Sequence, residues 1–148
     1  MKKHEFMKKF ALSAAVFAAM LIFSGCLSVD NSGCLSVDNN SRTCEELANH
    51  MMRYTGATLD PRPFVFESVK AENGFGLKLD GQDVVFVKYN TKRKKMRARL
   101  AYVDKNGFLF IAGFKIPAIR HGSFVMMDYM RFKPETKKKL LKAFQSFD

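Results

Sequence analysis

Cys44, His121 and Asp128 are the residues whose types could form a catalytic group. A cysteine followed far downstream by a histidine and an acid supplies a nucleophile, a general base and an orienting carboxylate. Cys44 falls in the first turn of a predicted helix, where the partial positive charge of the helix end lowers a thiol pKa. The sequence contains no nucleophile elbow, Walker loop, dinucleotide fingerprint or HExxH motif. These three residues are therefore the one catalytic constellation that the sequence offers.

The order of these residues resembles that of the small papain-like cell-wall amidases, in which a cysteine at a helix start precedes an antiparallel sheet carrying histidine. The resemblance implies a cysteine peptidoglycan hydrolase. The family's Asp-Cys-Ser-Gly context is replaced here by Arg42-Thr43-Cys44-Glu45-Glu46, and acids beside a thiol oppose its ionisation. We expect a buried Cys44 and no enzyme, with the hydrolase as a minor alternative. Ligand spacing is also missing around Cys44, so we expect no metal and no cofactor.

The first 25 residues have the organisation of an export signal. Four lysines precede a 14-residue apolar run, Phe10 to Phe23, which only Ser13 interrupts. A membrane-spanning helix needs about 20 apolar residues, so this run is short for a retained anchor. The small residues Ser24 and Gly25 at its end favour cleavage. We therefore expect residues 1–25 to be a signal peptide.

Phe23-Ser24-Gly25-Cys26 resembles the lipobox of bacterial lipoproteins. The resemblance implies that the Cys26 thiol receives a diacylglyceryl group and that signal peptidase II cuts before it. Leu27, where an Asp would favour inner-membrane retention, implies sorting to the outer membrane of a Gram-negative cell. The protein is then a lipoprotein of the cell envelope that faces the periplasm.

An identical octapeptide, SGCLSVDN, occupies residues 24–31 and again 32–39. The second copy makes Cys34 a repeat of Cys26, but Asn31 replaces the apolar residue that a lipobox needs. We interpret residues 26–42 as a flexible tether lengthened by duplication. In an oxidising compartment Cys34 could pair with Cys44, or Cys44 could stay a buried thiol. Both alternatives are open.

Residues 43–148 are predicted to form a single α+β domain. Capping-box spacing at Thr43 and Glu46 predicts a helix over 44–55, closed by Gly56. Pro134 and an apolar stripe predict a C-terminal helix. Between them, alternating polarity predicts a roughly six-stranded antiparallel meander that forms a curved sheet or half-barrel. The predicted strands are near 64–70, 74–80, 83–90, 96–104, 107–116 and 123–132.

Positive charge is concentrated in two segments. The whole chain carries +11, and residues 1–25 hold four lysines and one glutamate, so the rest carries +8. In the first segment Arg93, Lys95, Arg97 and Arg99 alternate, so on a strand they would share one face of a basic hairpin. The second segment, 131–142, lies on the predicted C-terminal helix. The candidate anion-binding residues are Lys88, Lys92, Arg93, Lys95, Arg97 and Arg99, with a merely solvated hairpin as the alternative.

An exported, lipid-anchored protein meets a limited set of anions. Acyl chains would attach it to a membrane, and its basic hairpin could bind anionic lipid, lipopolysaccharide, cell wall or an acidic protein, but we expect no nucleic acid. We expect a non-enzymatic accessory or binding lipoprotein. A periplasmic inhibitor or immunity protein for a secreted toxin is the alternative.

Overall fold

The computed structural model describes residues 37–148, which form three α-helices and one antiparallel sheet of six strands. The predicted α+β class, with a helix near each end, is confirmed. The helices are α2 (Cys44–Thr55), α3 (Lys94–Asn106) and α4 (Pro134–Gln145). The strands are β1 (Thr58–Leu59), β2 (Asn73–Leu79), β3 (Gln82–Lys88), β4 (Phe108–Ile111), β5 (Phe114–His121) and β6 (Phe124–Met127). Two short 3-10 helices, η1 (Phe66–Val69) and η2 (Tyr129–Arg131), complete this region of the chain.

The strands do not follow one another as a continuous meander. Their order in the sheet is β1-β2-β3-β6-β5-β4, so β3 pairs with β6, and α3 forms the connection between the two halves. Each half alone is a three-stranded meander. The sheet is open, with β1 and β4 at its edges. The expected connectivity is wrong because the segment predicted as a fourth strand is helical.

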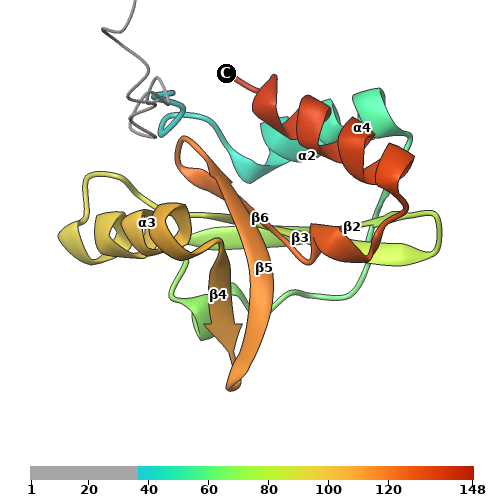
Figure 1. The fold of residues 1–148 in the computed structure, drawn as a ribbon. Helices are drawn as coiled ribbons and strands as arrows, with labels where there is room; N and C mark the ends of the chain where they lie inside the picture. Colours follow the sequence, from blue (N-terminus) through green and yellow to red (C-terminus); the bar gives the residue numbers. More distant parts are fainter. Residues whose placement is uncertain (1–36) are drawn as a thin grey trace, which may run out of the picture. The chain divides into compact units, whose positions relative to one another are not determined.

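Helices cover both faces of the sheet (Figure 1). Along β3, Val84 and Phe86 point into a core formed with α2 and α4, whereas Val87 points into a second core formed with α3 and η1. The alternation predicted for this strand is therefore present, and it serves two cores instead of one. Leu47, Met51, Phe86, Leu140 and Phe144 fill the first core, and Val69, Tyr89, Leu100, Leu109 and Val125 fill the second.

Helix α2 confirms its sequence signals. The Thr43 hydroxyl accepts from the Glu46 N–H at 3.1 Å, and the Glu46 carboxylate accepts from the Thr43 N–H at 2.7 Å. Gly56 ends the helix in the left-handed region at φ 78°. All of these contacts lie within the helix and its caps, so local sequence determines them.

The strand predicted over 96–104 is wrong, since Lys94–Asn106 is the helix α3. Met96, Leu100 and Val103, which face the second core, are spaced at i, i+4 and i+7 as in a helix. Met96 and Leu100 also belong to the alternating series that predicted a strand. These two residues therefore fit both the period of a strand and the period of a helix. Ala98 is exposed, contrary to the strand interpretation, and Gly107 caps the end of the helix in the left-handed region.

Three other predicted strands differ from the structure. The segment 107–116 is not one strand, because Ala112 and Gly113, at φ 48° and 87°, turn the chain between β4 and β5. The segment 64–70 contains η1 in place of a strand, and the strand predicted over 123–132 ends at Met127. The predicted strands near 74–80 and 83–90 are β2 and β3.

Candidate functional site

Four of the six predicted anion-binding residues, Lys92, Arg93, Lys95 and Arg97, lie around the start of α3 rather than on a hairpin. Arg93 is the N-cap of the helix, and Lys94 and Lys95 are its first residues. Arg97 follows one turn after Arg93. We call Lys92, Arg93, Lys94, Lys95 and Arg97, all exposed, the basic face.

Two of the predicted residues have other surroundings. Lys88 is half-buried on β3, where its Nζ donates to Arg42 O at 2.5 Å and lies 5.9 Å from the centre of the Phe124 ring. Arg99 is half-buried beside the second core, close enough to Tyr89 to act on its pKa. Lys88 is thus mainly structural, and Arg99 lies at the margin of the basic face.

The positive charges of the basic face destabilise the helix that carries them. The N-terminus of a helix has partial positive charge, which favours acidic residues and disfavours lysine and arginine. The first turn of α3 contains no acid, and Arg93 makes no side-chain cap bond. α2, by contrast, has Glu45 and Glu46 in its first turn. The charges at the start of α3 therefore reduce the stability of this helix.

No acid within residues 37–148 forms an ion pair with the basic face. The ion pairs of this region join Arg42 to Glu46, Arg62 to Asp60 and Asp83, Arg120 to Asp104, and Arg131 to Asp128. Arg97 instead donates to two backbone carbonyls, Thr91 O at 3.0 Å and Lys92 O at 3.2 Å, so it also holds the loop before α3. Carbonyl acceptors do not neutralise its charge.

The chain enters the domain beside this basic face. Asn40 Oδ1 accepts from the Thr91 N–H at 2.8 Å, one residue before Lys92. Asn39 is 1% exposed, and its Oδ1 accepts from the Ser123 N–H at 2.7 Å and the Ser123 hydroxyl at 2.9 Å. Its Nδ2 donates to His121 O at 3.4 Å. The path of the chain at residues 39 and 40 is therefore fixed by specific hydrogen bonds.

These contacts place the start of the folded domain before residue 43. Asn39 is the last residue of the second SGCLSVDN copy, so the end of the repeat belongs to the domain and not to the predicted tether. Gly122 makes room for it, since a Cβ at this position would overlap the Asn39 amide. Sequence reasoning missed Asn39, because its partners lie 82 and 84 residues away. The one signal for it in the sequence was that both copies of the repeat end in asparagine, at residues 31 and 39.

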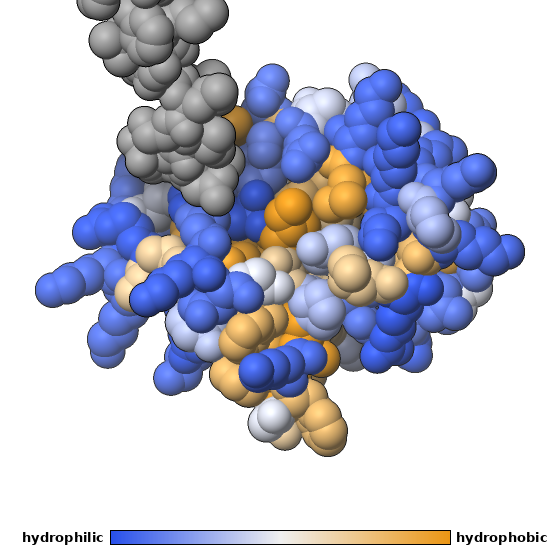
Figure 2. Space-filling model, in the orientation of Figure 1, coloured by the Kyte–Doolittle hydropathy of each residue, from blue (hydrophilic) through white to orange (hydrophobic). Residues whose placement is uncertain are grey.

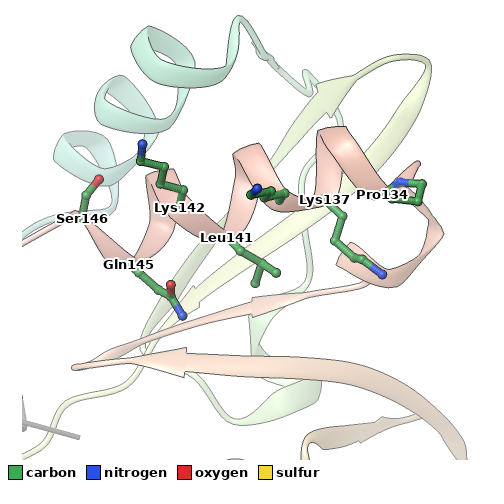
Figure 3. Close-up of a pocket in the computed structure, with 7 residues that line it drawn as sticks. Pro134, Lys137, Leu141, Lys142, Gln145 and Ser146 are labelled. Atoms are coloured by element: carbon green, nitrogen blue, oxygen red, sulfur yellow. The ribbon is translucent and has the colours of Figure 1, made fainter.

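A second group of lysines lies on α4. Lys137, Lys138 and Lys142 surround Leu141 in an open groove of about 510 Å³ along the helix. Figure 3 shows Leu141, Lys137 and Gln145 projecting from one side of α4 and Lys142 and Ser146 from the other. The predicted packing role of this helix is confirmed by Leu140 and Phe144, which are fully buried. The lysines are spread around its open side.

The β4–β5 hairpin carries two exposed phenylalanines. Phe114 is 72% exposed and Phe110 47%, and Figure 2 shows hydrophobic side chains gathered at this end of the domain. A groove of about 560 Å³ lies under the hairpin, with Val85 and Met127 in its lining. Lys115 caps the Phe108 ring at 4.8 Å from its centre.

The structure places Cys44 in the first core, where it is 9% exposed. Burial raises the pKa of its thiol to about 11, the opposite of the shift that a nucleophile needs. His121 Nε2 lies 2.7 Å from Phe147 O, and Asp128 pairs with Arg131 at 2.9 Å. The three candidate catalytic residues thus have separate structural partners. Cys44 is a free thiol, and its suggested partner Cys34 lies outside the described residues, as does Cys26.

Alkylation of the native protein should test the burial of Cys44. We expect iodoacetamide at about pH 8 to modify Cys44 at least about 100-fold more slowly than in urea, because the folded thiol is covered and protonated. Peptide mass spectrometry separates Cys44 from the other cysteines. Since the folded pKa of about 11 exceeds the usual 9.0, this thiol should also make the fold less stable as the pH rises from 9 towards 11. Equal alkylation rates in the two states would contradict the buried position.

Two kinds of feature are absent from the described region of the chain. Within residues 37–148, His, Cys, Asp and Glu side chains form no group of three that could hold a metal ion. The helices of the same residues are all too short or too polar to cross a membrane. Comparison of the chain with protein-family models, curated proteins and solved structures found no match.

Proposed function

We propose that this chain is a lipid-anchored binding protein of the bacterial cell envelope that holds an anionic partner on its basic face. The lipobox-like Phe23-Ser24-Gly25-Cys26 supports the anchor, with Cys26 as the acylated residue and the outer membrane as its location. The described domain holds Asn39 and Asn40 by hydrogen bonds and carries the basic face at its margin. In this proposal the domain does not act as an enzyme.

The observation that carries the proposal is the unpaired charge at the start of α3. Five exposed cations lie within six consecutive residues, at the end of the helix where they are least favourable. The five acids that form ion pairs within residues 37–148 all pair with arginines outside the basic face. An arrangement that costs stability and is not neutralised internally is explained by an anion supplied from outside.

A charge-reversal variant tests this role directly. The full chain in zwitterionic detergent should bind polyphosphate, and Lys94→Glu with Lys95→Glu should weaken that binding at least about 10-fold at low salt. The salt slope should fall by about 2, one for each lost contact. The measurement is a titration at several salt concentrations.

The matched control reverses two exposed lysines of α4, Lys138→Glu with Lys142→Glu, which changes the net charge by the same amount. We expect this variant to keep most of its affinity. Equal losses in the two variants would mean that net charge alone attracts the anion, and the basic face would then have no special role.

Stability should change in the opposite direction from binding. Lys94→Glu and Lys95→Glu place acids at the positive end of α3, so each should raise the free energy of unfolding by about 0.3–1 kcal/mol. Urea denaturation followed by circular dichroism measures the change. A variant that binds less and is also less stable would indicate damage to the fold instead of loss of a contact.

A further inference from the structure

The position at which the chain enters the domain limits how far each surface can lie from the proposed anchor. Asn40 bonds to the Thr91 N–H, and Arg97 of the basic face donates to the carbonyl of the same residue. Hydrogen bonds from Ser123 to Asn39 fix the position of the residue before Asn40. Figure 1 shows the pale-blue start of the described chain passing close to the loop that leads into α3. The chain therefore enters the domain next to the basic face.

The distance back to the proposed anchor is short. Val37 lies eleven residue steps after Cys26, which is at most about 40 Å of chain. Helix α3 has 13 residues and is about 20 Å long. The connection is thus long enough to let α3 lie along a membrane surface.

The outer side of α3 suits a planar anionic layer. Lys94, Ala98, Ala101 and Lys105 are all exposed and recur at helical spacing on the side opposite Leu100 and Val103. The two alanines leave no bulk between the lysines. The one acid of the helix, Asp104, is paired with Arg120 at 2.5 Å. A row of cations over small side chains can approach headgroup phosphates without first displacing large residues.

We propose that the anionic partner of the basic face is the headgroup layer of the bilayer that carries the anchor, so that the domain lies on its own membrane with α3 against it. This inference rests on the proposed function and names its partner. The attachment then combines two contributions, because acyl chains hold the chain and cations orient the domain. Since β5 runs from Phe114 to His121, the exposed β4–β5 hairpin lies at the far end of this strand from the residues that hold Asn39.

Lysine acetylation can report the orientation, because each candidate surface has its own lysines. The acylated full chain is placed in vesicles of phosphatidylcholine alone or with about one third phosphatidylglycerol, briefly acetylated, and read by mass spectrometry. On anionic vesicles, labelling of Lys92, Lys94 and Lys95 should fall at least about 3-fold. Lys138 and Lys142 of α4 and Lys115 of the hairpin should not change. About 0.5 M salt should remove the protection.

Each other outcome overturns the inference in a recognisable way. Protection of Lys115 alone would mean that the apolar hairpin meets the bilayer, and protection of Lys138 and Lys142 would mean that α4 does. Unprotected α3 lysines in a protein whose polyphosphate binding still depends on Lys94 and Lys95 would leave the proposed function standing, with a soluble polyanion or an acidic protein as partner. If the polyphosphate binding also fails to depend on them, both proposals are wrong.

The matched variants sharpen the same test. Lys94→Glu with Lys95→Glu should abolish the lipid-dependent protection of Lys92 on anionic vesicles, whereas Lys138→Glu with Lys142→Glu should leave it intact. Circular dichroism confirms that both variants are folded before they are compared. Protection of Lys92 that survives the α3 reversal would contradict the orientation that we propose.

Discussion

Replacing Cys26 by serine is expected to release the protein from the membrane fraction and to abolish its labelling by palmitate. The proposed acyl chains bury many methylene groups, each worth about 0.8 kcal/mol, and serine offers no thiol to carry the diacylglyceryl group. The basic face alone should hold the domain weakly and only at low salt. Metabolic labelling and fractionation at low and high salt measure both effects.

The duplicated octapeptide supplies a matched control for this prediction. Cys34 has the same eight-residue context as Cys26, but Asn31 precedes its Ser32-Gly33, where Phe23 precedes Ser24-Gly25 in the first copy. Cys34→Ser should therefore leave palmitate labelling and membrane attachment unchanged. Labelling that persists in Cys26→Ser and disappears only in the double variant would show that Cys34 is acylated, and the lipobox interpretation would be wrong.

The features of the fold that could be predicted are those set by neighbouring residues. The capping box of Thr43 and Glu46 and the glycine at 56 fix α2 within a stretch of 14 residues, and the structure confirms both ends. The turn at Asp80 and Gly81, at φ 51° and 73°, likewise joins β2 to β3 as its sequence indicates. Such contacts need no knowledge of the rest of the chain.

Helix α3 could not be predicted in this way, because its sequence fits two periods. Met96, Leu100 and Tyr102 satisfy alternation, while Met96, Leu100 and Val103 satisfy the helical spacing. The start of the helix has no cap residue and carries repelling charges, so the usual start signals are missing. The charges that form the candidate site therefore also made the start of α3 difficult to predict from the sequence.

The arrangement of the candidate anion-binding residues differs from the prediction. Arg93, Lys95, Arg97 and Arg99 were expected to share one sheet face, but on a helix Arg93 and Arg97 lie on one side and Lys95 and Arg99 on another. The contact between Asn40 and Thr91, which brings the start of the domain to this site, spans 51 residues. A contact of that range depends on the sheet order, which the local pattern did not predict.

Gly122→Ala is expected to destabilise the domain by about 2–4 kcal/mol, among the largest effects of any single substitution outside the core. Gly122 has φ 60°, which strains an alanine, and the new methyl group would displace the Asn39 amide from Ser123. The displaced amide would leave the buried Ser123 N–H without an acceptor. Urea denaturation of the full chain in mild detergent measures the loss.

Gly81→Ala is the control for backbone strain, because Gly81 has φ 73° and open space where the methyl group would lie. It should cost about 1 kcal/mol. Asn39→Ala should cost about 1–3 kcal/mol by itself, and in that background Gly122→Ala should cost no more than Gly81→Ala, because the amide it would displace is gone. Fully additive effects of Asn39→Ala and Gly122→Ala would contradict the contact. The non-additive result would establish that Asn39 is held against Gly122 and Ser123, which fixes the path of the chain where it enters the domain.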